Sequence, residues 1–284
     1  MTNEIKTTMV NTQATTEVWA TKMDDFVFNG KHIIGVKNPD VTHIRFPEGI
    51  TDIGIPSADI STTKNYFNNL KYIYISKSIK NIWRYTFYNK KSLQTIVFDK
   101  DCQINYIGEA AFENTGIINL FLPESIKYIC SGAFCNCNNL ISVNIKSKIN
   151  ALEDSVFEDC NNLITVKLSE TVKDIGHFSF SGCSSLKEVD INSCINLKYI
   201  SSMAFSNCSS LETFKLPPSK RIVLANAVFE DCIGLKNIIV SSITKLETDT
   251  DTFEGCYALT TTEDEGISKK DAADAYLMRR GIIL

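Results

Sequence analysis

One stretch of the sequence decides the fold: LFLPESIKYICSGAFCNCNNL, residues 120–140. It starts with apolar residues in alternation, turns at Pro123, and continues through a second pair of apolar residues. It ends with Phe134, Cys137 and Leu140, which stand three residues apart. The change of apolar period within one short block indicates an extended segment followed by tight turns.

The same block recurs along most of the chain. Phenylalanine returns every 20–25 residues, at Phe67, Phe87, Phe112, Phe134, Phe157, Phe180, Phe205, Phe229 and Phe253. Six copies contain the complete F-x-x-C-x-x-L motif, with cysteines at Cys137, Cys160, Cys183, Cys208, Cys232 and Cys256. The earlier copies are looser, with Lys90 or Thr115 at the cysteine position. An internal repeat of this length predicts stacked structural units that share one core.

Each repeat also predicts its own local structure. Two alternating apolar residues follow the last Leu of the motif, as Val143 and Ile145 follow Leu140, and predict a short strand with one buried face. A turn and a second apolar pair predict a short extended or 3₁₀ segment, and the Phe block predicts a turn of helix. The fold class is therefore an α/β solenoid, a leucine-rich repeat of about nine repeats of 22–25 residues with a parallel β-sheet on one face.

The two ends of the chain are expected to be caps. Residues 1–40 are predicted to form a flexible N-terminus and an N-terminal cap, residues 41–263 the solenoid, and residues 264–284 a C-terminal capping helix. The helix is expected from about Lys269 to Arg280, because Ser268 and Asp271 resemble a capping box and Gly281 is a stop signal. Within the solenoid, residues 57–64 are expected to form a surface loop.

The repeat pattern L-x-x-I-x-I-P-x-S-I-x-x-I-x-x-x-A-F-x-x-C-x-x-L resembles the BspA-like subclass of leucine-rich repeats. The resemblance covers roughly Val41 to Leu259 and is specific for the fold. It implies a surface protein of the kind found on host-associated bacteria and parasitic protists, with a role in adhesion to proteins or cells. The sequence departs from the common surface form because it has no readable signal peptide, membrane anchor or Ser/Thr-rich stalk. A cell-surface or extracellular location is therefore the expectation from the resemblance, and a cytoplasmic location is the alternative.

Charge and hydropathy exclude several classes of partner. The net charge is −4, too small to favour nucleic acid, and no apolar run reaches the roughly 18 residues of a membrane span. Charge is nevertheless uneven. Residues 61–100 contain eight Lys and Arg against one acidic residue, and residues 247–274 contain nine acidic residues against two lysines. We interpret this as a charge dipole on a solvated surface. We expect no nucleic acid partner and no insertion into a membrane.

The cysteines and histidines indicate neither a catalytic site nor a metal site. Six of ten cysteines occupy one repeat position, which favours buried reduced thiols, with disulfides between adjacent rungs as the alternative. The spacing of Cys130, Cys135 and Cys137 is metal-like, but no histidine or second pair accompanies it. No catalytic or phosphate-binding motif accompanies His32, His43 or His177. We therefore expect no metal, no cofactor and no enzymatic activity.

The outward side of the predicted strands contains the candidate site. Alternation places Arg45, Tyr72, Tyr74, Val97 and Phe121 there as an aromatic and apolar patch, while later strands present small or polar residues. Aromatic residues and Arg are enriched in binding hot spots, and exposed apolar patches usually mark contacts. The prediction is a monomeric, non-enzymatic protein-binding module, with adhesion or surface recognition as its role. Two alternatives stay open: the cap or the loop at residues 57–64 covers the patch, or the chain is an intracellular scaffold.

Overall fold

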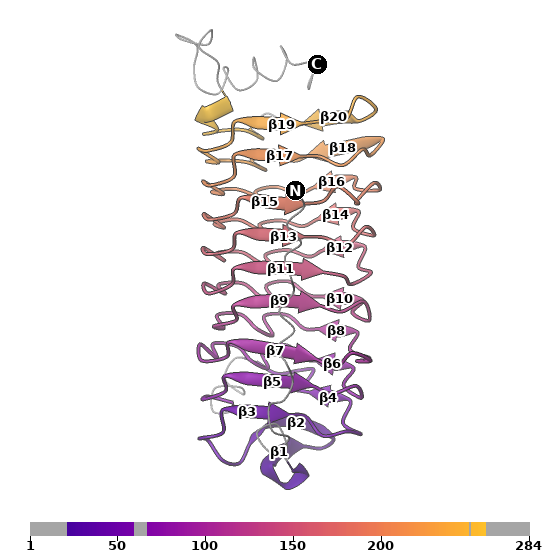
Figure 1. The fold of residues 1–284 in the computed structure, drawn as a ribbon, viewed down its shortest axis with the longest axis vertical. Helices are drawn as coiled ribbons and strands as arrows, with labels where there is room; N and C mark the ends of the chain where they lie inside the picture. Colours follow the sequence, from indigo (N-terminus) through magenta and orange to yellow (C-terminus); the bar gives the residue numbers. More distant parts are fainter. Residues whose placement is uncertain (1–21, 60–66, 250, 260–284) are drawn as a thin grey trace, which may run out of the picture.

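The computed structural model describes residues 22–59, 67–249 and 251–259, and it is a solenoid of stacked rungs (Figure 1). Each rung contributes one strand to a first face. In the described residues these strands are β3 (His43–Arg45), β5 (Tyr72–Ile75), β7 (Thr95–Phe98), β9 (Asn119–Leu122), β11 (Ser142–Ile145), β13 (Thr165–Lys167), β15 (Glu188–Asp190), β17 (Thr213–Lys215) and β19 (Asn237–Ile239). The strands pair in parallel within three groups, β3 to β7, β9 to β15 and β17 to β19, so the predicted solenoid with parallel strands on one face is confirmed.

The predicted extended segments form a second parallel sheet on the opposite side of the rungs. Its strands are β4 (Asp52–Ile53), β6 (Asn81–Ile82), β8 (Tyr106–Ile107), β10 (Tyr128–Ile129), β12 (Ala151–Leu152), β14 (Asp174–Ile175), β16 (Tyr199–Ile200), β18 (Arg221–Leu224) and β20 (Lys245–Thr248). We call this the second face. At its N-terminal edge the antiparallel hairpin of β1 (Phe26–Asn29) and β2 (His32–Val36) pairs with β4.

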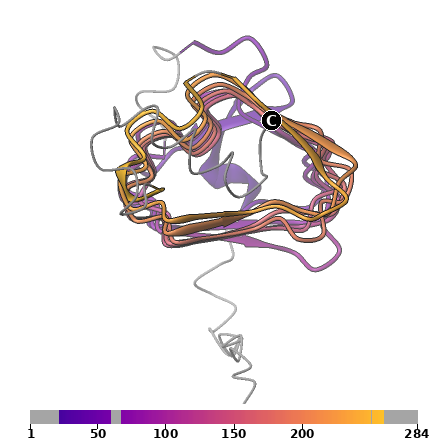
Figure 2. The same cartoon turned by 90° about the horizontal axis from the view of Figure 1, so that it is seen from above.

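Both faces bury every second residue in one core. Figure 2 shows the rungs superposed in a view along the solenoid. The buried side chains of both sheets and of the Phe blocks form one cluster inside them. On the first face Ile73 lies beside Ile44, and on the second face Ile82 lies beside Ile53, all fully buried. Burying an Ile or Leu side chain stabilises a fold by about 1.5–3 kcal/mol, and each rung adds several. Repetition of the apolar pattern is therefore what holds the solenoid together.

The Phe block is not helical, which corrects the expected helical turn. Among the described residues the only helical segments are two short 3₁₀ turns, η1 (Met23–Asp25) and η2 (Tyr257–Leu259). The residues two positions before and two after most of the spine phenylalanines have positive φ, for example Ser155 (56°) and Asp159 (55°) around Phe157. A right-handed helix cannot pass through such positions. The Phe block is instead a ribbon of alternating backbone handedness, which we call the Phe wall.

The backbone N–H groups of the Phe wall form hydrogen bonds between rungs rather than within a helix. The amides of Phe134 and Asn136 donate to the carbonyls of Val156 and Glu158 on the next rung, at 3.0 and 2.8 Å. The amide of Phe157 repeats the pattern one rung later, with the carbonyl of Ser179 at 2.9 Å. All three of these hydrogen bonds point in the same direction along the solenoid, so their peptide dipoles are aligned. In an ordinary β-sheet the strand dipoles alternate in direction.

Phenylalanine and cysteine form two ladders inside this wall. From Phe112 to Phe253 the rings stack at centroid distances of 5.2–5.6 Å with interplanar angles of 2–13°. Each motif cysteine donates its thiol to the Phe carbonyl of the preceding rung, as Cys160 does to Phe134 and Cys183 to Phe157, both at 3.2 Å. All ten cysteines are free thiols in the structure. The repeated cysteine therefore supplies a hydrogen bond as well as buried volume.

Two expectations about loops and caps fall mainly outside the described residues. The predicted capping helix at 264–284 lies entirely outside them, as do residues 60–64 of the predicted loop. No helix within the described ranges is long and apolar enough to cross a membrane.

Candidate protein-binding face

The first three strands of the first face bring four of the five predicted site residues together. In-register pairing of β3, β5 and β7 places Arg45, Tyr74 and Val97 in one outward row, and Tyr72 in the row beside it. Arg45 is exposed, and the other three side chains are half-buried. The alternation that buries Ile73 and Ile75 is what turns the two tyrosines outward.

Tyr74 is the centre of a small polar network. The Arg45 guanidinium lies over the Tyr74 ring at 4.5 Å, and the Tyr74 hydroxyl donates to Asp99 Oδ2 at 2.7 Å. Burial, this hydrogen bond and the Asp99 charge raise the pKa of Tyr74 to about 12. The pKa of Asp99 is lowered by the Asp101 amide and the Tyr74 hydroxyl. Tyr74 is therefore a fixed, neutral ring flanked by charges of both signs.

Tyr72 is ordered by a second stacking contact. The rings of His43 and Tyr72 lie parallel, with centroids 4.5 Å apart and an interplanar angle of 14°. Burial and the nearby Lys71 charge lower the pKa of His43, which favours the neutral imidazole. The rings of Tyr72 and Tyr74 are thus both held in place by neighbouring side chains.

Phe121 belongs to a separate group of strands. The described strand pairing is interrupted between β7 and β9, and Phe121 on β9 begins the next group. Its ring is 50% exposed, and the Lys146 ammonium lies 5.1 Å from the ring centre. The five predicted residues therefore form a cluster of four, Arg45, Tyr72, Tyr74 and Val97, with Phe121 one rung beyond. We call the five together the aromatic patch.

The rest of the first face presents a different surface. Its outward residues in the later strands are small, polar or charged, and Lys167 forms an ion pair with Asp190 at 3.0 Å. Ile239 on β19 is the exception, with 47% of its surface exposed. Exposed ion pairs of this kind contribute little to binding or stability. The aromatic patch is thus confined to the N-terminal half of this face.

The second face has an aromatic ladder that sequence reasoning missed. Trp83 packs against Tyr106 with ring centroids 5.1 Å apart, and Tyr106 packs against Tyr128 at 6.5 Å. The ladder is anchored by the buried carboxylate of Asp52, which accepts hydrogen bonds from the Trp83 indole and from Asn81. Its signal in the sequence was a Tyr immediately before the buried Ile of the second apolar pair, at residues 106 and 128.

The three cysteines with metal-like spacing do not converge. Cys137 is in the buried ladder, Cys135 lies outside it with its sulfur near the Asn136 amide, and Cys130 follows β10. Burial raises the pKa of Cys135 to about 12, so its thiolate is scarce at neutral pH. In the ranges that the structure describes, no group of three His, Cys, Asp or Glu side chains is arranged to hold a metal ion.

Comparison with known proteins identifies the repeat. The model of the BspA-type leucine-rich repeat region matches residues 58–175 and 151–266 in six copies, which is more than half of the chain. No curated protein matches the chain.

Several solved structures are similar at low identity. A leucine-rich cell surface protein from Faecalibacterium prausnitzii is 19% identical with a TM-score of 0.47, over 83% of this chain and 79% of that chain. A leucine-rich repeat protein from T. pallidum is 19% identical with a TM-score of 0.45, over 88% and 95% of the two chains. The pneumococcal vaccine antigen PcpA is 16% identical with a TM-score of 0.29, over 90% and 96%. Similarity at this level carries no argument about function.

Proposed function

The chain belongs to the BspA-type leucine-rich repeat family, and from that premise we propose that it is a non-enzymatic module that binds a protein partner through the aromatic patch. The contact residues in this proposal are Arg45, Tyr72, Tyr74, Val97 and Phe121. The finer role that we propose is adhesion or recognition at a cell surface.

The observation that carries the proposal is the pre-ordered aromatic cluster on an otherwise polar sheet. Tyr72 is stacked on His43, and Tyr74 is held between Arg45 and Asp99. Rigid aromatic rings and an Arg provide contact area at low entropic cost, which is the composition of binding hot spots. Phe121 extends the surface toward the next strands, and its half-exposed ring has apolar area available for a partner.

A second candidate function is an intracellular scaffold, and the cysteines favour it. Every cysteine is a free thiol, and all except Cys130 are buried. Adjacent motif thiols lie on neighbouring rungs of an unbridged ladder, which suits a reducing compartment. Surface labelling of intact cells separates the two proposals, because an adhesion module must be accessible from outside and a cytoplasmic scaffold must not be.

The test of the proposed site compares two triple variants of the whole chain. The patch variant is Tyr72→Ser/Tyr74→Ser/Phe121→Ser. The control variant, Thr213→Ser/Lys215→Ser/Ile239→Ser, changes three outward residues on two later strands of the same face. Both must show unchanged circular dichroism and melting before binding is compared in pull-downs from host and own-cell extracts.

We expect partners that bind the wild type and the control variant but not the patch variant. Partners identified by mass spectrometry are then purified and tested for direct binding. Binding of the same partners to all three proteins would exclude the aromatic patch as the site. The location of a confirmed partner would also distinguish adhesion from scaffolding.

A further inference from the structure

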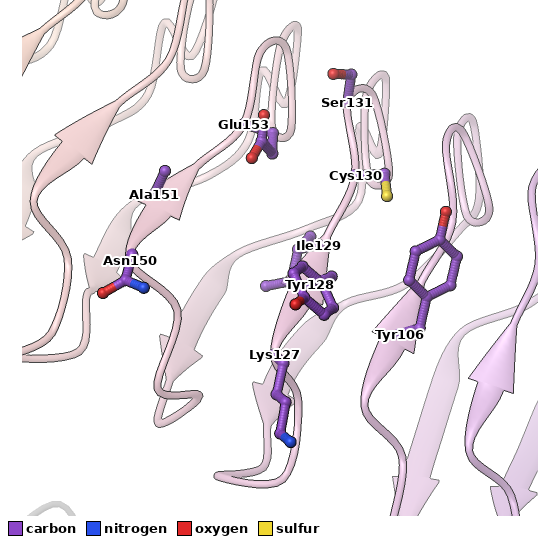
Figure 3. Close-up of a pocket in the computed structure, with 9 residues that line it drawn as sticks. All are labelled: Tyr106, Lys127, Tyr128, Ile129, Cys130, Ser131, Asn150, Ala151 and Glu153. Carbon is purple, nitrogen blue, oxygen red and sulfur yellow. The ribbon is translucent and has the colours of Figure 1, made fainter.

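A pocket of about 300 Å³ lies on the second face, beside the last ring of the aromatic ladder (Figure 3). Tyr128 and Cys130 line it from one rung, and Asn150, Ala151 and Glu153 line it from the next. The volume is at the lower end of the range for ligand pockets. It is far too small for a folded element, but it suits a single side chain.

The pocket exists because the ladder stops at this point. The described strand pairing of the second face is interrupted between β10 and β12. Where Tyr106 and Tyr128 stand on neighbouring rungs, the next rung has only the methyl group of Ala151. Tyr128 consequently packs against Tyr106 on one side and is 63% exposed. Its other ring face is available to an incoming group.

One carboxylate, that of Glu153, and one ammonium, that of Lys127, line this pocket. Glu153 is exposed and forms no ion pair within the described residues, whereas the neighbouring Glu109 is paired with Arg84 at 2.8 Å. Burial and the charges of Glu153 and Glu109 raise the pKa of Cys130, which places its thiol in the field of both carboxylates. Lys127 also lines the pocket, but its ammonium and the Glu153 carboxylate lie at opposite ends in Figure 3.

We infer that this pocket binds an arginine side chain of a protein partner, with the guanidinium over the Tyr128 ring and its N–H groups donating to Glu153. A cation over an aromatic face is attracted by the ring quadrupole. The planar guanidinium can stack on a ring and bond a carboxylate through two parallel hydrogen bonds, which a lysine ammonium cannot do. An acidic side chain would instead have to lie against the unpaired Glu153.

This site is separate from the aromatic patch, which is on the opposite sheet. The inference does not depend on the proposed function, and the two can fail independently. The two sites share one rung, which contributes Phe121 to the patch and Tyr128 to the pocket.

The experiment uses the full chain and a pair of short peptides. The probe is an acetylated and amidated Gly-Gly-Arg-Gly-Gly, and its control has citrulline, the uncharged isostere, in place of arginine. Binding is followed by the amide chemical shifts of Cys130, Ala151 and Glu153 in a nitrogen-15 NMR titration. The variants are Tyr128→Ser and Glu153→Gln, both at exposed positions where the fold tolerates change, and Glu124→Gln is the matched charge control on the same rung as Tyr128.

The arginine peptide is expected to give saturable shifts at these three amides. Citrulline and Glu153→Gln should each weaken binding by about tenfold or more, since each removes a charge-assisted hydrogen bond. Tyr128→Ser should weaken it by about two- to fivefold, and Glu124→Gln should leave it unchanged. The inference is overturned if no saturable shift occurs, if citrulline binds equally well, or if Glu153→Gln and Glu124→Gln behave alike.

Discussion

The first rungs and the later rungs of this solenoid differ both inside and outside. From Phe112 onward the stacked rings are nearly parallel, and a thiol ladder runs beside them. In the first rungs Phe46 and Phe67 meet edge to face at 75°, and Lys90 replaces the motif cysteine. On the outer surface of the first face the aromatic residues are confined to the rungs up to that of Phe121, which is the first rung with the complete Phe–Cys–Leu motif. The rungs beyond it display small, polar or charged side chains on this face, with Ile239 as the exception.

From this contrast we propose that regular packing and protein recognition are divided between the two regions. In a stacked repeat protein each rung stabilises its neighbours, so regular packing in one part can support a less regular part. We interpret the later rungs as the stable body of the solenoid and the first rungs as its binding end.

The largest effect is expected from the regular spine. Phe157→Ala removes a fully buried ring that is stacked on both Phe134 and Phe180. The free energy of unfolding should fall by about 3–5 kcal/mol, because a cavity of ring size cannot collapse between two fixed rungs. Urea denaturation followed by circular dichroism measures the loss. Phe157→Leu is the control and should cost clearly less, because the leucine side chain fills most of the cavity. Equal losses would mean that the cavity volume does not set the cost.

The next effect concerns the carboxylate that anchors the first rungs. Asp52 is buried, which raises its pKa, but hydrogen bonds from Thr51, Asn81 and Trp83 outweigh this and lower the pKa below its usual value of 3.8. Asp52→Asn should cost about 1–3 kcal/mol at neutral pH, because an amide satisfies these donors less well.

The pH dependence of that cost follows from the sign of the pKa shift. A depressed folded pKa means that the stabilisation is complete above the unfolded pKa and is lost as pH falls through the folded pKa. The wild type should therefore lose its advantage over Asp52→Asn in acid, as measured by urea midpoints across a pH series. A difference that stays constant down to acid pH would show that the Asp52 charge does not stabilise the fold.

A smaller effect is expected from the thiol ladder. Cys183→Ala leaves the buried carbonyl of Phe157 without its thiol donor and should cost about 1–2 kcal/mol. Cys183→Ser retains a donor at the same place and should cost less. If both variants unfold at the same urea concentration, the thiol contributes volume only.

In labelling experiments on the native protein, Cys130 should react before any motif cysteine, because it is the only cysteine that is not buried.

The smallest effect is expected at the binding end. Tyr74→Phe removes the hydrogen bond to Asp99 and should lower the free energy of unfolding by only about 0.5–1.5 kcal/mol. Ultraviolet titration should at the same time lose one tyrosine that ionises near pH 12. A loss of unfolding free energy as large as that of Phe157→Ala would show that the first rungs contribute as much to stability as the later ones.

The buried residues and the strands of both faces could be predicted from the sequence. Alternation around Ile73 and Val143 predicts which residues face inward, because strand side chains alternate with a period of two. The Phe wall was harder, since Tyr85, Phe178 and Met203 adopt positive φ without being Gly or Asn. The signal that was available lies two residues after each Phe, where the chain has Asn89, Asn114, Asn136, Asp159, Gly182, Asn207, Asp231 and Gly255. These residue types tolerate the left-handed conformation, so they argue against a helix.

The candidate site was predictable only in part. Alternation placed Arg45 and Tyr74 on the outer surface, but the bond from Tyr74 to Asp99 depends on the path of the turn after β7. The pocket beside Tyr128 depends on the interrupted strand pairing between β10 and β12, which the sequence pattern within one repeat does not predict. Contacts between neighbouring rungs follow from the three-dimensional register, and a single repeat does not contain that information.

The most direct test of the division between body and binding end is site-specific photo-crosslinking. A benzophenone amino acid replaces Phe121 in one protein and Ile239 in another, two exposed apolar positions in the outward row of the first face. Both proteins are irradiated in the same host and own-cell extracts, and the adducts are identified by mass spectrometry. We expect a discrete adduct with one partner from position 121 and none from position 239. Adducts of equal yield from both positions, or from position 239 alone, would contradict a binding end in the first rungs.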